Sequence, residues 1–151
     1  MSDDEKVVQM CHALYVEDPS PMEISEGQTR RTLSVLRREP GRGCAVVLEL
    51  RAEIAGYALL ISFWSNELGG EVLVIDELYI CPSFRGQGHA RALLTSLAEK
   101  SQLWPEAIVA LELEVTPQNT KAAALYQSLG FSPVKNQRMR FLLQRLQGSG
   151  G

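Results

Sequence analysis

The spacing of hydrophobic residues along the chain first predicts two helices. Within residues 4–16, apolar side chains recur every three or four positions behind acidic residues, a pattern typical of an amphipathic helix. A second, weaker helix is expected from Ser25 to Glu39, because Pro40 and Gly41 then end the helical pattern. Two helices therefore precede any expected strand.

Strand-like runs of branched and aromatic residues follow these helices. Residues 44–50 and 54–64 are separated by the polar tripeptide "RAE", and this arrangement predicts a hairpin. The turn-forming stretch "SNELGGE" then precedes a third strand at residues 72–80. The sheet is expected to begin with these antiparallel strands.

Helical and strand-like patterns alternate in the second half of the chain. Residues 107–115 predict a strand, in which Glu112 and Glu114 alternate with apolar residues and indicate one solvent-exposed face. An amphipathic helix is expected before it, where apolar residues have the spacing of one helix face, at Ala90, Leu93, Leu94, Leu97 and Ala98. The remaining expected elements are a helix and two short strands, at residues 117–131, 131–134 and 138–146.

This order of elements predicts an α+β fold. We expect an α/β-type sandwich, with a mixed, mostly antiparallel sheet and helices on both faces. The chain shows no internal repeat and no linker. Residues 1–147 are therefore predicted to form a single domain and residues 148–151 a flexible tail.

Composition narrows the functional classes. The chain has 151 residues, of which 45% are hydrophobic and 22% charged, as in ordinary globular proteins. Three widely spaced cysteines and two histidines favour neither a disulfide framework nor a metal site, and the net charge of −3 argues against nucleic-acid binding. No apolar run approaches the roughly 18 residues of a membrane helix, and the start is acidic. We expect a cytoplasmic protein with no membrane contact.

The loop "RGQGHA" at residues 85–90 has the chemistry of an anion site. Gly86 and Gly88 lack Cβ atoms, so backbone N–H groups can approach a ligand, and the helix that follows has unpaired N–H groups in its first turn. A pyrophosphate suits both features, although many glycine-rich loops are plain turns. The dinucleotide and Walker patterns do not fit this loop.

Two longer stretches identify a family that uses such a loop. The segments "IDELYICPSFRGQGHARALL" and "LELEVTPQNTKAAALYQSLGF" resemble the two central motifs of the GNAT superfamily of acetyl-CoA-dependent N-acetyltransferases. The positions that match those motifs are Arg85, Gly88, Ala90, Asn119, Ala122 or Ala123, Leu125, Tyr126, Gly130 and Phe131. The chain departs from the family at its start, where the residues before the first helix leave no room for the usual first strand.

The resemblance implies an N-acetyltransferase that moves the acetyl group of acetyl-CoA to a primary amine by direct attack in a ternary complex. It also implies that the cofactor's pantetheine amides add as a pseudo-strand beside residues 76–80 and that the Leu78 N–H polarises the acetyl carbonyl. The positions that would bind the co-substrate are Leu78, Ile80, Arg85, Gly86, Gln87, Gly88, His89, Ala90 and Asn119. No metal is implied.

Candidates for the catalytic groups follow from the same comparison. Asp76 or Glu77 would take the proton of the amine, and strand alternation, which gives Asp76 the parity of Leu78, slightly favours Asp76. Tyr126 would protonate the leaving thiolate. Each has a structural alternative: the two acids as solvated or ion-paired groups and Tyr126 as a core residue.

Asn119 and His89 also have structural alternatives. Asn119 lies at the turn into the last expected helix, where it is well suited to cap the helix N-terminus. His89 is more consistent with a solvent-facing loop residue than with a base.

The acceptor amine is less well defined. The family holds it between the first two helices, their connecting loop and the turn before the third strand, and these segments are acidic here. Trp64 with Tyr15 would offer an aromatic wall to a cation. A polyamine, an amino-sugar, and a lysine or N-terminal amine of a peptide or protein all fit.

Two further expectations concern function class and assembly. A catalytically silent acyl-CoA-binding, sensing or interaction module is the alternative to an active enzyme. Without a first strand, residues 44–50 form an exposed sheet edge, so we expect a homodimer that pairs through an edge strand or through residues 138–146.

Overall fold

The computed structural model describes residues 2–99 and 103–143, beginning with two capped helices. These are α1 (Asp3–Glu17) and α2 (Glu26–Arg38). The α2 cap is reciprocal: the Gln28 N–H donates to Ser25 Oγ (3.2 Å), and the Ser25 N–H donates to Gln28 Oε1 (2.9 Å). Both predicted helices are confirmed. They were predictable because the capping residues lie next to the helices in the sequence.

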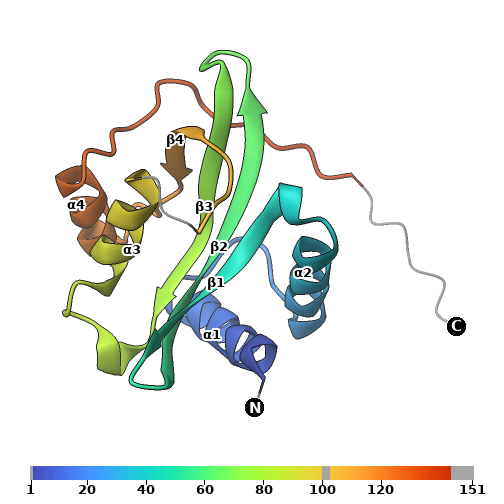
Figure 1. The fold of residues 1–151 in the computed structure, drawn as a ribbon, viewed down its shortest axis with the longest axis vertical. Coiled ribbons are helices and arrows are strands. Elements are labelled where there is room, and N and C mark those ends of the chain that lie inside the picture. Colours follow the sequence, from blue (N-terminus) through green and yellow to red (C-terminus); the bar gives the residue numbers. More distant parts are fainter. Residues whose placement is uncertain (1, 100–102, 144–151) are drawn as a thin grey trace, which may run out of the picture.

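A mixed sheet follows the helices. It contains β1 (Gly43–Leu50), β2 (Glu53–Ser65), β3 (Gly70–Ile80) and β4 (Ile108–Leu113), in the order β1-β2-β3-β4. The first three strands are antiparallel, and β4 lies parallel to β3 (Figure 1). The predicted α+β class and the predicted hairpin are confirmed, and in the described part of the chain no strand precedes α1.

Helices cover both faces of this sheet. On one face, α1 and α2 pack against Tyr57, Leu59 and Tyr79. On the other face lie α3 (His89–Ala98) and α4 (Thr120–Ser128). Single turns of 3₁₀-helix occur at Pro40–Arg42, after α2, and at Pro82–Phe84, after β3. The core of this second face combines residues of three elements: Ala58, Leu60, Leu73, Ile75, Leu93, Leu94 and Leu97.

A β-bulge interrupts β3 in its C-terminal half. Leu59 of β2 faces Glu77, whereas the next residue, Leu60, faces Ile75, so Asp76 is an extra residue in β3. The bulge changes the side-chain alternation: Ile75 packs beneath α3, and Glu77 lies on the opposite face against α1. Simple alternation would have put both on one face.

The two predicted C-terminal strands are wrong over the residues that the structure describes. Residues 131–143 form neither helix nor strand, and Val134, Met139 and Phe141 are 76%, 89% and 88% exposed. The local pattern is strand-like, but a strand also needs a neighbouring edge, and this segment pairs with none in the described structure. Residues 144–146 and the predicted tail lie outside the described residues.

Candidate active site

The parallel strands β3 and β4 diverge and leave an opening in the sheet. Their pairing ends at Ile75 and Leu113, where β4 also ends, while β3 continues to Ile80. The bulge at Asp76 falls at the point of divergence, and bulges bend and twist the strand that carries them. The opening therefore has a local cause in β3.

Backbone N–H groups of β3 face this opening. The Cys81 N–H donates to the Ala55 carbonyl of β2 (2.8 Å), and in an antiparallel ladder the N–H of Tyr79 takes the same direction. The N–H groups of Leu78 and Ile80 therefore point away from β2. This is the direction that the predicted contacts with an added strand require.

The glycine loop leads from the opening into α3. Gly86 and Gly88 have φ values of 74° and 82°, and Gly88 is the N-cap of α3. A Cβ atom on either would meet no described atom within 4 Å, so the backbone conformation favours glycine here. Within the described residues no side chain caps the first turn, which begins with His89 and Ala90. The Gln87 and His89 side chains lie 3.4 Å apart.

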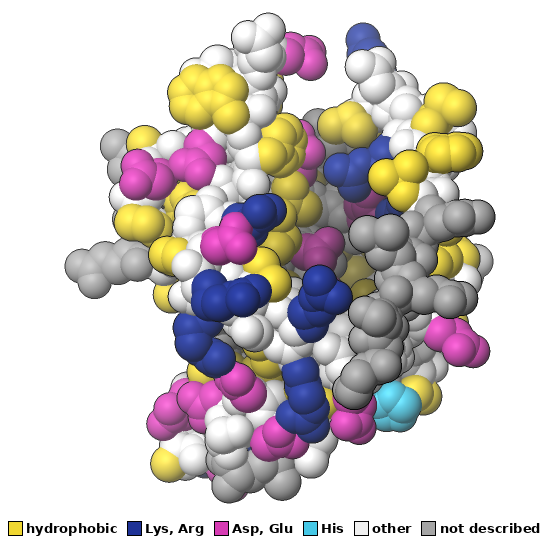
Figure 2. Space-filling model, turned by 90° about the vertical axis from the view of Figure 1, so that its right-hand side faces the viewer, with side chains coloured by type: hydrophobic (Ala, Val, Ile, Leu, Met, Phe, Trp, Pro, Cys, Tyr) yellow, Lys and Arg dark blue, Asp and Glu magenta, His cyan; other side chains and the backbone are white. Residues whose placement is uncertain are grey.

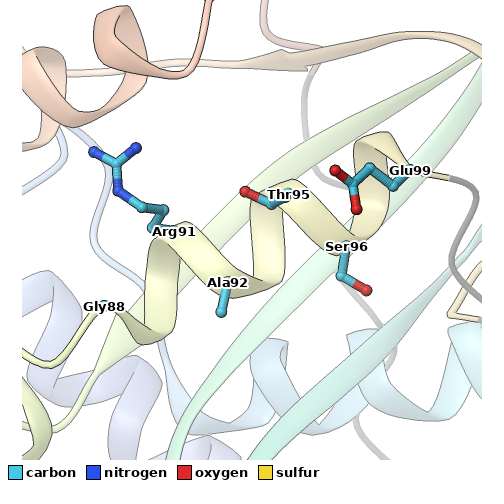
Figure 3. A pocket seen from close by; sticks show the side chains of 6 residues that line it. All are labelled: Gly88, Arg91, Ala92, Thr95, Ser96 and Glu99. Atoms are coloured by element: carbon cyan, nitrogen blue, oxygen red, sulfur yellow. The ribbon is translucent and has the colours of Figure 1, made fainter.

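A pocket of about 510 Å³ lies beside this loop along α3 (Figure 3). Its lining residues come from one face of the helix and its N-cap: Gly88, Arg91, Ala92, Thr95, Ser96 and Glu99. Arg91 donates to Ser128 Oγ of α4 (2.7 Å), which holds a positive charge next to the helix N-terminus. The loop, the free N–H groups and this cation together suit an anionic ligand.

The Arg85 side chain lies toward α1. Its Nε donates to the Ile80 carbonyl (2.8 Å), and its guanidinium lies over the Tyr79 ring and pairs with Glu17 at 2.8 Å. Tyr79 donates to the other Glu17 oxygen (3.3 Å). Arg85 thus joins the end of α1 to the end of β3, and its predicted contact with the co-substrate stays a prediction.

The two acidic candidates in β3 occupy different environments. Glu77 is 8% exposed and accepts hydrogen bonds from Tyr57 (2.7 Å) and Tyr15 (2.9 Å). Burial raises the pKa of Glu77, while the two phenols partly offset this shift. Asp76 is exposed, although loss of water around its carboxyl group raises its pKa, as does the charge of Glu114. Asp76 is thus the more accessible of the two.

Glu114 is an acid that sequence reasoning placed only on a solvated face. It directly follows β4, at the mouth of the opening, and pairs with Arg138 at 2.5 Å. It also lines a groove of about 940 Å³ together with Tyr126. Its position at the end of a strand beside β3 was the signal that could have identified it.

Tyr126 and Asn119 lie on α4. Tyr126 is half-buried, its ring centroid is 5.9 Å from that of Phe131, and burial and then the charge of Asp18 raise its pKa. Tyr126 therefore both packs in the core and faces the groove. Asn119 Oδ1 accepts from the Ala122 N–H (3.2 Å), as the alternative cap role predicts.

The predicted aromatic wall around the acceptor is wrong. Trp64 is 70% exposed and faces Glu71 near the tip of the β2–β3 hairpin, whereas Tyr15 contacts Glu77. The seven residue steps from Glu71 to Leu78 along β3 span roughly 20 Å, so Trp64 lies far from the opening. Asp18, by contrast, lies near Tyr126, because its charge acts on the Tyr126 hydroxyl. Its carboxylate accepts a hydrogen bond from Thr116 (3.0 Å).

Three features of the described residues bear on nucleic-acid, metal and membrane binding. On the face shown in Figure 2, Lys and Arg side chains lie among Asp and Glu side chains rather than in one basic stripe. In residues 2–99 and 103–143, no group of three or more His, Cys, Asp or Glu residues could hold a metal ion. No described helix is long and apolar enough to cross a membrane.

The fold and the site define a class of α+β domain in which an anion-binding loop adjoins two diverging parallel strands. Residues 8–131 match the acetyltransferase (GNAT) family, and the chain belongs to that family.

Relatives and solved structures agree with this assignment. The chain is 44% identical over 57 residues to the [ribosomal protein bS18]-alanine N-acetyltransferase of Haemophilus ducreyi, a match that covers 38% of each chain. It is 38% identical over 79 residues to the thialysine N-epsilon-acetyltransferase of Caenorhabditis elegans, covering 52% of this chain and 48% of the relative. The matches thus span less than half the length of these relatives.

Among solved structures, a possible acetyltransferase from Clostridium difficile has a TM-score of 0.78 at 19% identity, covering 94% of this chain and 92% of that one. A ribosomal-protein-alanine N-acetyltransferase from Brucella melitensis has a TM-score of 0.69 at 18% identity, covering 92% and 94%. At these identities the similarity shows a common fold.

Proposed function

We propose that this protein is an N-acetyltransferase that moves the acetyl group of acetyl-CoA to a primary amine by direct attack in a ternary complex. The observation that carries the proposal is the opening between β3 and β4, with the N–H groups of Leu78 and Ile80 directed into it and the glycine loop at its end. Family membership supports the same chemistry.

Main-chain groups would hold the co-substrate. The pantetheine amides pair with the N–H groups of Leu78 and Ile80, as in strand addition. The pyrophosphate accepts hydrogen bonds from the glycine loop and the first turn of α3, beside Arg91. Side chains of the loop and of Asn119 add contacts at its edges. The Leu78 N–H also stabilises the negative charge that develops on the acetyl oxygen.

Proton transfer requires an acid and a base at the opening. A lysine-like amine has a pKa near 10.4, so roughly one in a thousand is free base at neutral pH. Asp76 takes its proton directly or through water, because it is exposed at the divergence of the strands. Glu77 is the alternative base, and its contact with Tyr15 is its route to the surface. Tyr126 protonates the departing thiolate.

The acceptor is a cationic amine. Asp18 and Asp76 add negative charge beside the opening, which favours an ammonium group, whereas Glu17 and Glu114 are paired with Arg85 and Arg138. The relatives are named for an alanine of a ribosomal protein and for thialysine, so both a protein N-terminus and a small amine are candidates. We further propose a homodimer, since β1 and β4 are both edge strands in the described sheet. The cytoplasmic location expected from the sequence is part of the same proposal.

Turnover on an amine panel tests the proposal. The purified chain is incubated with acetyl-CoA and a small diamine, an amino-sugar, free lysine or a peptide with N-terminal alanine. Thiol release and the mass of the product are measured. An acetylated amine is the expected result. Binding of acetyl-CoA without turnover on any amine would favour the silent acyl-CoA-binding module instead.

A further inference from the structure

The end of α1 contacts both strands that border the opening. Glu17, the last residue of α1, pairs with Arg85 at 2.8 Å and accepts a hydrogen bond from Tyr79 of β3 (3.3 Å). The next residue, Asp18, accepts a hydrogen bond from Thr116 (3.0 Å), which follows β4. These two consecutive acids, called here the α1 terminus, therefore connect the β3 side of the opening to its β4 side.

Helix α1 does not hold this terminus in place by itself. The last turn of α1 contains no basic residue, and acidic side chains at a helix C-terminus interact unfavourably with the helix dipole. Residues 19–25, which include two prolines, form neither helix nor strand before α2 begins. The position of the α1 terminus therefore depends on its contacts with the two sides of the opening.

Arg85 fixes the β3 side of this connection. Its Nε donates to the Ile80 carbonyl (2.8 Å), its Cζ lies 5.3 Å from the Tyr79 ring centroid, and its Nη2 donates to Glu17 (2.8 Å). A lone exposed ion pair contributes little to stability. Here, however, the planar guanidinium is already held at Ile80 and Tyr79, so it loses little further freedom when it binds Glu17.

The α1 terminus lies on the side of the opening that the co-substrate leaves free. Helix α3 and the pocket beside Arg91, where the phosphates are proposed to bind, lie on the opposite face of the sheet from α1 (Figure 1). An amine that attacks the acetyl group must therefore approach from the face that α1 covers.

Asp18 is the acid that such an amine would meet. Arg85 neutralises Glu17, whereas Asp18 is held by the neutral hydroxyl of Thr116. One hydroxyl supplies one hydrogen bond, so the Asp18 carboxylate can still accept others. Its charge is also close enough to raise the pKa of Tyr126, which faces the opening from α4. Asp18 is thus well placed to bind an entering ammonium group.

We propose that Arg85 is a positioning residue for the acceptor amine: through Glu17 it holds the α1 terminus across the opening, so that Asp18 faces the entering ammonium group. The inference rests on the proposed acetyl transfer and names a determinant of its amine binding. It gives the Arg85 side chain a different role from the contact with the co-substrate that the family resemblance implies. Loss of Arg85 would leave Glu17 unpaired and Asp18 without a fixed position.

Two substitutions that remove the same ion pair test this role. Arg85→Gln and Glu17→Gln are assayed with an amine that the wild-type chain acetylates. Each should raise KM for the amine about 10-fold, which corresponds to the loss of one charge-assisted hydrogen bond. The kcat and the Kd for acetyl-CoA should change little, because binding of the amine alone is weakened. The double variant should be no worse than the poorer single variant, since both substitutions break one contact.

Arg37→Gln is the matched control. Arg37 pairs with Asp4 at 2.8 Å in the first turn of α1, so this variant also removes an ion pair that holds α1, but at the other end of the helix. Its KM for the amine should keep the wild-type value. An increase equal to that of Arg85→Gln would show that general loosening of α1 weakens amine binding, and the specific role of Arg85 would be lost.

Hydrogen exchange tests the tether without turnover. The Asp18 N–H donates to the Leu14 carbonyl (2.8 Å) and reports on the last turn of α1. This amide should exchange faster in Arg85→Gln and in Glu17→Gln than in the wild type, because the turn opens more often, and Arg37→Gln should not change its rate. An unchanged rate in the first two variants would show that Arg85 does not hold the α1 terminus.

The remaining outcomes separate this inference from the proposed function. If Arg85→Gln weakens acetyl-CoA binding by about 10-fold while Glu17→Gln affects neither substrate, Arg85 is a ligand of the co-substrate and the inference is wrong. If neither variant changes KM for an amine that the wild type acetylates, acetyl transfer stands and the positioning role falls. If the wild type acetylates no amine, the proposed function fails and the role in amine binding fails with it.

Discussion

The substitution Tyr57→Phe separates the structural role of Glu77 from a catalytic one. Tyr57 is fully buried, and its hydroxyl donates to Glu77 at 2.7 Å. The variant keeps the ring and removes only this donor, so Glu77 retains the hydrogen bond from Tyr15. The change therefore acts mainly on the ionised form of one carboxyl group.

The expected loss of stability depends on pH. A hydrogen bond to an ionised group contributes about 1.5–3 kcal/mol, and one between neutral groups about 0.5–1.5 kcal/mol. Burial raises the pKa of Glu77 in the folded chain, and the Tyr57 hydrogen bond opposes that increase, so its removal raises the folded pKa further. The additional destabilisation is absent below the unfolded pKa of roughly 4.3 and develops as pH rises through the folded pKa.

Urea unfolding at about pH 4 and pH 8 measures this difference. We expect Tyr57→Phe to lose about 1 kcal/mol at the lower pH and about 2–3 kcal/mol at the higher one. In a Glu77→Gln background the pH dependence of the loss should disappear, because no carboxylate forms. Equal losses at both pH values in the wild-type background would refute the assigned environment of Glu77.

The same variant reports on catalysis. If Glu77 is the base, Tyr57→Phe raises its pKa and moves the acid limb of the kcat/KM profile to higher pH. If Asp76 is the base, that limb stays in place while stability still falls. A shift of the acid limb would therefore contradict our preference for Asp76.

Three further predictions concern the proposed reaction. Coenzyme A should raise the melting temperature, and Gly88→Glu should abolish this increase because it puts a negative side chain beside the proposed pyrophosphate site. The control Gly88→Ala tests the φ of 82° alone, and its melting temperature should still rise with coenzyme A. Unchanged binding of coenzyme A by a folded Gly88→Glu variant would exclude the phosphate role. Tyr126→Phe should lower kcat by about 10- to 1000-fold with little change in affinity for acetyl-CoA, and an unchanged kcat would leave Tyr126 a core residue. Asp76→Asn should lower the rate more at pH 7 than at pH 9, where free amine is roughly 100-fold more abundant, and equal effects at both pH values would remove Asp76 from proton transfer.

Local signals made most of the fold predictable. The reciprocal cap of Ser25 and Gln28, the polar turn between β1 and β2, and the glycine before α3 all act within a few residues, so the sequence contains their complete cause. The same is true of Asn119 as a helix cap. The positions of these elements follow from short-range chemistry.

Features that depend on distant partners were missed or mistaken. Residues 138–143 look like a strand, but local pattern cannot supply an edge to pair with. Arg85 contacts Glu17, which lies 68 positions away in the sequence, and no local pattern predicts that pair. Glu114 is a candidate site residue only because it lies beside the opening next to β3. Its alternation with apolar residues in the sequence is typical of any solvated strand face.

The bulge at Asp76 explains why two adjacent acids can have different roles. A regular strand would direct Asp76 and Glu77 to opposite faces but would keep β3 paired with its neighbours. The extra residue instead bends β3 where its pairing with β4 ends, so Asp76 is exposed at the opening while Glu77 is enclosed by Tyr57 and Tyr15. An exposed carboxylate can exchange protons with an entering amine, whereas an enclosed one must first break hydrogen bonds to two phenols. The geometry that opens the sheet thus leaves Asp76 accessible, as the proposed proton transfer requires, and uses Glu77 to hold α1 against β3 through Tyr15.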